Sequence, residues 1–445
     1  MKALSRAAAA VMVAVGSVLL LATPSGAAPL TTDPAVGRAG AARWMIAQLG
    51  SNGLVPSMVD PSQPDLAATA HVVLALRQTG YGKDAATTAA NALGAHVDDF
   101  VVGQNGDNPA NLALLILIAE ALGLDPHSFG TAHTDLVTRL EATARTTGSD
   151  AGLYGAGDPT YDGPFRQGLA LAALSLVDPP AANSAPVTWL LAQQCADGSW
   201  MYRADLSKPC AFDPVSFAGP DTNATALAAM GLHAVGVSAP VAPLAWLAQM
   251  RGSDGGWSFN GGASSASDPD STGLVIAAYS TLGEAIPDGA TAKLLSFQFG
   301  CDAAATDQGA FWYPPFDNSP PTANLLATHD ATVGLVDGPW PASLTSAAWQ
   351  AGPPADPCAG AATTTTSTAP ATTTTLVAAT TTTIASSASV LSATADPSSS
   401  SSPPSQSLAL TGSHDGPIAL VGLALVAGGG ALALTSSTIR RRARR

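Results

Sequence analysis

The sequence has few charged residues and few aromatic residues. Asp, Glu, Lys and Arg make up 11% of the 445 residues, and Phe, Trp and Tyr make up 5%. Lys and Arg together number 18, against 32 Asp and Glu. Nucleic-acid binding relies on basic side chains that neutralise phosphates, so this composition disfavours such a role. The shortage of rings also disfavours a cavity that stabilises carbocations, which depends on aromatic side chains.

The first residues indicate export from the cytoplasm. Lys2 and Arg6 precede an apolar run that continues through Leu21, and small residues follow at 25–28. This order is typical of a secretory signal peptide, which we assign to residues 1–28 with cleavage near Ala27. The mature chain is therefore expected to begin a separate domain at about residue 29.

The last residues, 408–445, form a second targeting signal. Its parts, in order, are the pentapeptide from Leu408 to Gly412 (LALTG), the apolar stretch Ile418–Leu434 and the tail Arg440–Arg445. This order resembles a sortase sorting signal, although Ala409 stands where the commonest form has proline. The resemblance implies that sortase joins Thr411 to peptidoglycan and that the residues after it are removed.

A plain membrane anchor is the alternative reading of the same segment. The 17 apolar residues from Ile418 to Leu434 can nearly span the hydrocarbon of a bilayer, with the arginines left in the cytoplasm. The membrane would then be a permanent partner instead of a transient one. Both readings leave the preceding domain outside the cell, attached to the envelope.

Residues 359–407 read as a disordered stalk. They consist almost wholly of Thr, Ser, Ala and Pro, which cannot bury enough apolar surface to fold. Fully extended, the segment reaches on the order of 150 Å at roughly 3.3 Å per residue. It is long enough to carry a domain through a wall layer. O-glycosylation and an unmodified flexible spacer both remain open for it.

The mature chain is strongly acidic. The signal removes two basic residues, and the tail after Thr411 removes five arginines and Asp415 from the 18 basic and 32 acidic residues. The remaining 11 basic and 31 acidic residues give a net charge of about −20. We interpret this charge as the solubility of an exported protein, not as a site for cationic ligands.

Four cysteines in an exported chain predict two disulfides instead of a metal cluster. Three pairings are possible. We favour Cys195 with Cys210, which lie in one connection between helices, and Cys301 with Cys358, which would tie the last repeat to the trailing segment. No spacing of cysteine and histidine suggests zinc, so neither a metal nor a cofactor is predicted.

A repeated phrase organises residues 29–358. Its fullest copy runs from Trp189 to Trp200 (WLLAQQCADGSW). Weaker copies are Trp44 to Gly53, Gln249 to Trp257, Gln298 to Trp312 and Asp150 to Tyr154. Such periodicity is typical of proteins built from stacked repeats.

A second landmark runs in step with this phrase. An Asp or Asn opens a segment of small and apolar residues six times, at Asp65, Asp107, Asp162, Asp221, Asp270 and Asn318. We expect each of these residues to cap the second helix of a two-helix unit, because its side-chain oxygen can accept first-turn amide hydrogens. The result is six helical hairpins.

The two helices of each unit are expected to lie in different layers. Ala224–Leu232 and Gly273–Leu282 are apolar nearly all round, which predicts inner helices. Ala41–Leu49 and Thr188–Gln194 carry their large apolar residues on one stripe, which predicts outer helices. Over about residues 34–350 the chain resembles the prenyltransferase and squalene-cyclase superfamily. The resemblance implies an all-α fold, an α/α toroid of six hairpins.

One segment resembles a catalytic motif of that superfamily. Asp268-Pro-Asp270-Ser271-Thr272 is similar to the Asp-x-Asp-Asp-Thr-Ala motif of squalene cyclases. The resemblance implies that Asp270 is the proton-donating acid, held protonated by burial beside a second carboxylate such as Asp268. Ser271 replaces the last acid of the motif. Helix capping is the preferred interpretation of Asp270, since other units place an Asp in the same register.

Other branches of the superfamily lack their signatures here. No Asp-x-Cys pair is present to bind zinc as in protein prenyltransferases, and His329-Asp330 is interpreted as a packing pair in the last inner helix. Few lysines are available to bind diphosphate, and the Gly-Cys-Gly-Glu-Gln stretch of the thioester branch is absent. Non-catalytic binding is the remaining branch.

We therefore predict a module that binds a small lipophilic or cofactor-like ligand, or a protein partner, without catalysis. The candidate ligand-binding residues stand at or near the starts of inner helices: Asn111, Asp221, Asn223, Thr225, Ser271, Thr272 and Asn324. Local capping is the alternative role for the same residues. The alternative function is an extracellular terpenoid cyclase or prenyltransferase-like enzyme that uses Asp270 as its general acid.

Overall fold

Twelve main helices form two layers in the described part of the chain. The computed structural model describes residues 28–155, 161–202, 210, 219–262, 264–315, 319–336 and 338–360. The outer helices are α1 (Pro34–Gln48), α3 (Lys83–Leu93), α6 (Leu136–Ala142), α8 (Ala185–Ala192), α10 (Pro243–Gln249) and α12 (Ala290–Leu295). The inner helices are α2 (Leu66–Thr79), α5 (Pro109–Leu122), α7 (Pro164–Leu174), α9 (Thr222–Ala234), α11 (Pro269–Thr281) and α13 (Leu325–Val333).

Short elements complete the described structure. Helix α4 (Val97–Val101) follows α3, and helix α14 (Ser343–Ser346) follows the last inner helix. Two small antiparallel hairpins pair β1 (Val55–Pro56) with β2 (Pro64–Asp65) and β3 (Val102–Gly103) with β4 (Gly106–Asp107). Each hairpin leads directly into the start of an inner helix.

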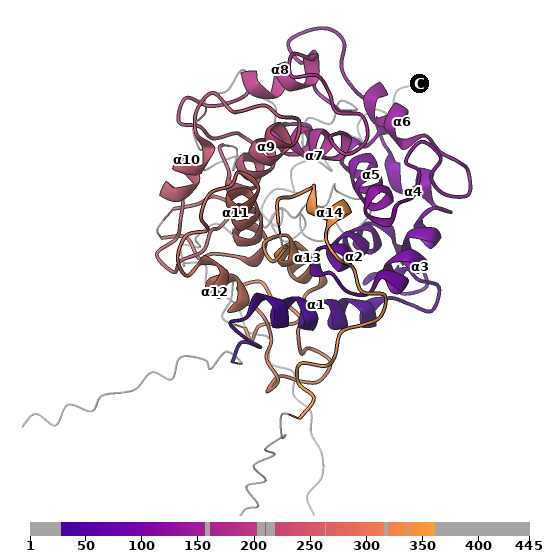
Figure 1. Ribbon diagram of the computed structural model, residues 1–445, viewed down its shortest axis with the longest axis vertical. Helices are drawn as coiled ribbons and strands as arrows, with labels where there is room; N and C mark the ends of the chain where they lie inside the picture. Colours follow the sequence, from indigo (N-terminus) through magenta and orange to yellow (C-terminus); the bar gives the residue numbers. More distant parts are fainter. Residues whose placement is uncertain are drawn as a thin grey trace, which may run out of the picture.

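The inner helices close into a ring (Figure 1). Contacts run from α2 to α5, α7, α9, α11 and α13 in turn, and α13 returns to contact α2. The first outer helix, α1, also contacts α13 and α12, so both layers close at one seam. The predicted all-α toroid of six hairpins with inner and outer layers is confirmed.

Small residues on the inner helices allow this close packing. Helix α5 is buried at every position from Pro109 to Ala119. Where α7 meets α9, Gly168 lies against Gly231, and a methyl group at Gly231 would collide with the Gly168 carbonyl oxygen. Close-packed interiors cannot absorb such added volume without moving the helices. The small-residue composition of these segments is therefore a requirement of the ring.

A repeated hydrogen bond joins five of the six outer-to-inner connections to the inner helix that follows. The acceptor is a side chain four residues after the helix cap, and the donor is the backbone N–H of the residue two positions after the glycine of the repeated phrase. The pairs are Thr69 with Val55 (2.9 Å), Gln167 with Tyr154 (2.8 Å), Thr225 with Trp200 (3.0 Å), Thr272 with Trp257 (3.0 Å) and Thr328 with Phe311 (2.9 Å). We call this contact the repeat joint.

The indole rings of the repeated phrase extend the repeat joint to the outer layer. Trp200 and Trp257 are fully buried. Their Nε1–H groups donate to the carbonyl oxygens of Leu190 (2.9 Å) and Leu247 (2.7 Å) in the outer helices α8 and α10. The phrase thus contains tryptophan because one side chain can fill the gap between layers and bond the outer helix.

Capping follows the predicted pattern with shifts of register. Asp65 and Asp221 cap α2 and α9 through the amides of Ala68 (2.9 Å) and Ala224 (2.7 Å), as predicted. The other caps differ from the prediction, and they are Asn108 instead of Asp107, Gly163 instead of Asp162, Asp268 instead of Asp270, and Asn324 instead of Asn318. Proline follows Asn108, Gly163 and Asp268 as the first helical residue, so the residue before the proline becomes the cap.

Two of the displaced acids, Asp107 and Asp162, bind arginines instead. Arg139 makes two hydrogen bonds to Asp107, at 2.7 and 2.8 Å. Asp162 accepts from Arg145 (3.0 Å) and Arg166 (3.1 Å). These carboxylates therefore stabilise the connections beside α6 and α7 and do not cap the start of an inner helix.

Residues 338–358, here called the C-terminal strap, return across the ring. Helix α14 lies within the ring in Figure 1 and contacts α2 and α5. The Arg77 guanidinium, at the end of α2, donates to carbonyl oxygens of the strap that include Ser343 (3.0 Å) and Ala347 (2.7 Å). Trp349 lies on the same guanidinium, 5.2 Å from its central carbon. The strap is thereby fastened at the end of the ring where the inner helices finish.

Two disulfides join Cys195 to Cys210 and Cys301 to Cys358, which confirms the favoured pairing. Disulfides are typical of proteins that mature in an oxidising compartment outside the cytoplasm. No helix in the described ranges is both long and apolar enough to cross a bilayer. The predicted signal peptide, stalk, sorting residues Leu408, Thr411 and Gly412, and C-terminal apolar helix lie outside the described residues.

Removal of one repeat joint tests its contribution to stability. Thr225→Val keeps the shape of the side chain but leaves the buried Trp200 amide without its acceptor, so we expect the free energy of unfolding to fall by about 1–3 kcal/mol. Denaturation in urea measures the change. Thr88→Val is the control, because Thr88 is exposed and its hydroxyl bonds only the Asp84 carbonyl of its own helix. Equal stability of the two variants would contradict the repeat joint.

Candidate functional site

Buried acids gather where α9 and α11 begin. Asp268 caps α11 through the Ser271 amide at 2.7 Å. Two residues later, Asp270 is completely buried and its Oδ2 accepts a hydrogen bond from Asn223 Nδ2 at 3.0 Å. Asn223 lies at the corresponding position of α9, two residues after the cap Asp221. Neighbouring repeats thus place an amide against an acid in the same register.

Asp270 retains one oxygen without a partner. Its Oδ1 is buried and has no hydrogen-bond partner in the described part of the chain. Burial raises the pKa of Asp270 well above its ordinary value, and the nearby charges of Asp330 and Asp268 raise it further. Both effects favour the neutral form of this carboxyl, which offers both an O–H donor and an acceptor.

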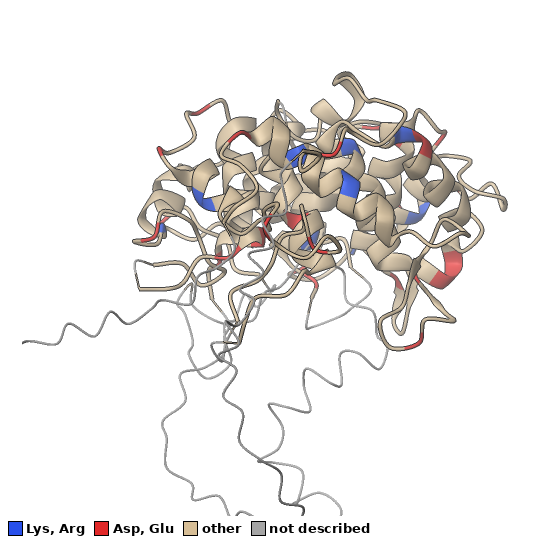
Figure 2. Ribbon diagram, turned by 90° about the horizontal axis from the view of Figure 1, so that it is seen from below, with Lys and Arg blue, Asp and Glu red and all other residues tan. Residues whose placement is uncertain are grey.

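Asp268 and Asp221 belong to the same acidic group. Burial raises the pKa of Asp268 to about 6, although hydrogen bonds from Ser271 act in the opposite direction. Burial also raises the pKa of Asp221 well above the ordinary 3.8. Most of the ribbon is tan in Figure 2, and the Asp and Glu residues lie at several separate places along it.

The structure adds a residue to the site that the sequence did not assign to it. Asp330 comes from α13, is completely buried, and accepts a hydrogen bond from the Tyr313 hydroxyl at 3.2 Å. Its charge acts on Asp270 and on Asp268. Ser271 occupies the place of the last acid in the Asp-x-Asp-Asp pattern, and Asp330 brings a further carboxylate from the neighbouring inner helix.

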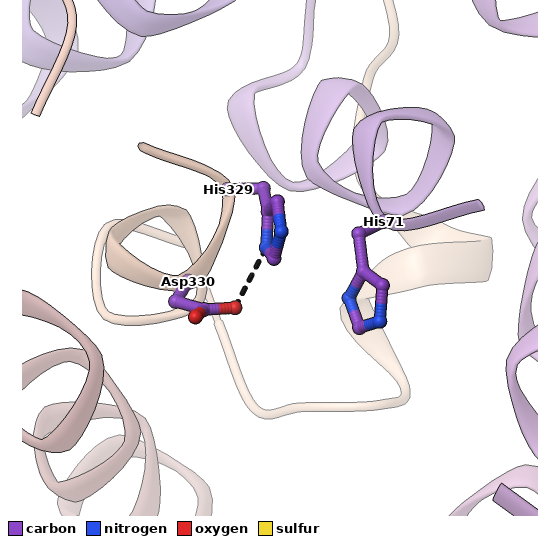
Figure 3. A group of neighbouring side chains, drawn as sticks. All are labelled: His71, His329 and Asp330. Atoms are coloured by element: carbon purple, nitrogen blue, oxygen red, sulfur yellow. Dashed lines mark ion pairs between the residues drawn. The ribbon is translucent and has the colours of Figure 1, made fainter. Parts of the chain in front are cut away.

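His71 and His329 lie beside Asp330 (Figure 3). His71 projects from α2, and His329 and Asp330 are neighbours on α13. A signal for this grouping exists in the sequence, because His71 and Asp330 each stand six residues after their helix caps, Asp65 and Asn324. These equivalent positions come together only because ring closure makes α2 and α13 adjacent.

Aromatic rings lie next to the acidic group. Tyr202 contacts Phe165 with ring centroids 5.1 Å apart and Phe259 with centroids 6.2 Å apart. The Phe259 carbonyl accepts the backbone N–H of Thr222 at 3.1 Å, which places this aromatic residue directly beside the start of α9. Aromatic residues are scarce in the sequence as a whole, but three of them gather beside the start of α9.

Several predicted binding residues make hydrogen bonds within the fold. Thr225 and Thr272 supply two of the repeat joints described above. Ser271 Oγ donates to Asp268 (3.1 Å), and Asn324 caps α13 through the Ala327 amide (3.0 Å). Asn111 donates to the Phe100 carbonyl (2.7 Å), away from α9 and α11. Their roles in ligand binding stay predictions.

Two cavities lie elsewhere on the described surface. A cavity of about 660 Å³ lies where α9 and α11 end, with His233, Leu244 and Tyr279 among its lining residues. Another of about 470 Å³ adjoins Asp107, Arg139 and Arg145. Neither is lined by Asp270 or by any residue predicted to bind a ligand, and the arginines of the second are already in ion pairs. Unlike these two cavities, the acidic group contains buried carboxyls with raised pKa values, so we take it as the candidate site.

Comparisons with known proteins extend the description of the fold. No protein-family model and no curated protein matches the chain. A solved type II terpene cyclase, MstE from Scytonema, in complex with merosterolic acid A, is 15% identical with a TM-score of 0.47; the match covers 68% of this chain and 96% of that one.

Two other solved structures are similar. A protein from Actinoplanes is 17% identical with a TM-score of 0.43 (68% and 98% covered), and an inactive variant of an α-1,6-mannanase of Salegentibacter sp., in complex with α-1,6-mannotriose, is 11% identical with a TM-score of 0.43 (70% and 99% covered). At such identities the likeness concerns the arrangement of helices and carries no argument about the activity of this chain.

The pH dependence of stability tests the burial of Asp221. Because the pKa of Asp221 is higher in the folded protein than in the unfolded chain, the unfolded chain loses this proton first as pH rises. The free energy of unfolding of the wild type therefore falls as pH rises above the ordinary value of 3.8. Asp221→Asn keeps the capping oxygen and cannot ionise. We expect the variant to gain on the wild type with rising pH, by at most about 1.4 kcal/mol per pH unit.

Urea denaturation at intervals between pH 4 and pH 8 measures this difference. Asp135→Asn is the control, since Asp135 also caps a helix (α6) but is exposed. Parallel stability curves for wild type and Asp221→Asn over that range would show that Asp221 ionises without cost.

Proposed function

We propose that this protein is an exported α/α-toroid module that binds a small lipophilic ligand carrying one uncharged oxygen group. The proposed site lies where α9 and α11 begin. The observation that carries the proposal is the Asp270 carboxyl, which is completely buried, bonded to Asn223 through Oδ2, and left with Oδ1 free of any partner in the described residues. A buried polar atom of this kind is costly unless something completes its bonding.

The surroundings of Asp270 define the class of ligand. A neutral carboxyl can donate to a hydroxyl or carbonyl oxygen, whereas the nearby acids Asp268 and Asp330 repel an anion. The rings of Phe165, Tyr202 and Phe259 offer apolar contact on the side of α7 and α9. These features together favour an uncharged molecule with an apolar body.

Acid catalysis is the second candidate function. Burial and two neighbouring carboxylates favour a protonated Asp270, which is the state that a proton donor to an isoprenoid double bond requires. Asp330 compensates in space for the acid that Ser271 replaces in sequence. The neighbouring rings would then face a developing carbocation. This reading makes the same site that of a terpenoid cyclase.

Mass measurement of the secreted protein tests the binding site. We expect native mass spectrometry of the full secreted chain to detect a co-purified molecule, and Asp270→Ala to lose it because the hydrogen-bonding carboxyl is gone. Asp65→Ala is the matched control, since Asp65 caps α2 in the same way that Asp268 caps α11. Loss of the molecule from both variants would contradict a role for Asp270 in binding.

The same preparation separates binding from turnover. Incubation with a linear polyprenyl alcohol should give a bound complex of unchanged ligand mass and retention time. A cyclised isomer formed by the wild type and not by Asp270→Ala would establish the second candidate in place of the first.

We further propose that sortase attaches the chain to peptidoglycan at Thr411, with residues 359–407 as a spacer. Thr411→Ala should block the transfer, so the protein should leave the wall fraction and stay with the membrane or enter the medium. Thr435→Ala, beyond the apolar stretch, is the control and should remain wall-bound. Immunoblots of cell fractions from the native host measure the distribution. An identical membrane location for wild type and both variants would establish plain anchoring.

A further inference from the structure

Three buried ligand-type side chains meet at the seam of the ring (Figure 3). His71 and His329 are 3% and 4% exposed, and Asp330 is fully buried. The imidazole rings lie with centroids 4.5 Å apart and 22° between their planes. One ligand atom from each of the three residues lies within 4.8 Å of the other two. These residues come from α2 and α13, the first and last inner helices.

The carboxylate of Asp330 lacks complete compensation. Its Oδ2 accepts from Tyr313, but its Oδ1 makes no hydrogen bond within the described residues. His329 Nδ1 lies 2.6 Å from that oxygen, yet the two groups belong to adjacent residues and their orientation does not form a hydrogen bond. A short approach without a directed hydrogen bond leaves lone pairs that a cation can share. Buried carboxylates are normally paired or coordinate a metal.

We propose that His71, His329 and Asp330 bind one Zn²⁺ ion, which joins the first and last inner helices of the ring. Two imidazole nitrogens and one carboxylate oxygen form a typical three-residue zinc set that leaves a fourth position open. Such ligands also suit Fe(II). The two disulfides indicate an oxidising compartment, where Zn²⁺ is favoured because it has no redox chemistry.

The distances require a small side-chain movement. Ligand atoms around tetrahedral zinc, with bonds of about 2.0–2.1 Å, lie about 3.3 Å from one another. Atoms that lie within 4.8 Å of each other must therefore approach by up to about 1.5 Å, and we expect rotation of the imidazole rings to supply this movement. The Thr332 hydroxyl of α13 donates to Gln78 Oε1 of α2 at 2.6 Å, so a second polar contact joins the same two helices.

The surrounding residues fit the pattern of a metal site. Tyr313 bonds the oxygen of Asp330 that would not bind zinc, and so orients the carboxylate in the way that outer partners of metal ligands do. Asp270 lies on the adjacent helix α11, and the charge of Asp330 acts on it. The zinc site does not depend on the proposed function, because closure of the seam by zinc requires no further ligand.

Metal analysis of the full secreted chain tests the proposal. After dialysis against Zn²⁺ and then against metal-free buffer, we expect about one zinc per chain by inductively coupled plasma mass spectrometry. His71→Ala and His329→Ala should weaken binding by at least about 100-fold in competition with a chromogenic chelator, and Tyr313→Phe by about 10-fold, since outer partners typically contribute 10–100-fold. His233→Ala, on an exposed histidine at the end of α9, should bind zinc as the wild type does.

Thermal unfolding supplies a readout that does not depend on the folding of one variant. Removal of zinc by chelator should lower the Tm of the wild type and of His233→Ala, and should leave His71→Gln and His329→Gln unchanged. Co²⁺ in place of zinc should give the visible absorption of a tetrahedral site in the wild type. A wild-type chain without zinc and with a Tm insensitive to chelator would overturn the proposal, as would equal loss of zinc in His233→Ala.

Discussion

Closure of the ring is the constraint on which the rest of the structure depends. The seam joins segments about 260 residues apart: Gln298 donates to the carbonyl oxygen of Gly37 at 2.9 Å, and the Trp44 indole donates to that of Thr306 at 2.8 Å. Closure also brings α13 against α2 and so creates the group of His71, His329 and Asp330. An open helical array with the same hairpins would keep each repeat and lose this site.

The polar residues of the inner helices fall into two sets with different physical roles. One set completes its hydrogen bonds inside the repeat, as Thr225 and Thr272 do when they bind the amides of Trp200 and Trp257. The other set, represented by Asp270 and Asp330, is equally buried but keeps an oxygen without a hydrogen bond in the described residues. Buried groups of the first set stabilise the fold. Those of the second lower its stability and are the better guides to function.

Several acids can be buried together because the repeats supply a rigid frame around them. Asp221 and Asp268 each accept first-turn amides of a helix, which offsets part of the cost of burial. Asp270 accepts a hydrogen bond from the Asn223 side-chain amide, and burial with the nearby charges of Asp330 and Asp268 raises its pKa well above the ordinary value. A cation at Asp330 would relieve part of the repulsion within the group.

The sequence by itself determined the repeat, because its phrase and its inner-helix composition are local. The copies of the repeated phrase, the Asp or Asn caps and the small apolar residues predicted six hairpins and their layers, and the cysteine positions predicted both disulfides. The exact caps escaped prediction where proline fixed the first helical residue, as at Asp268. Only the tertiary structure decided which polar residues meet. Asp330 lies close enough to act on Asp270 because consecutive inner helices pack together, and His71 stacks on His329 because the first and last inner helices become neighbours when the ring closes. Neither adjacency can be read from one repeat alone.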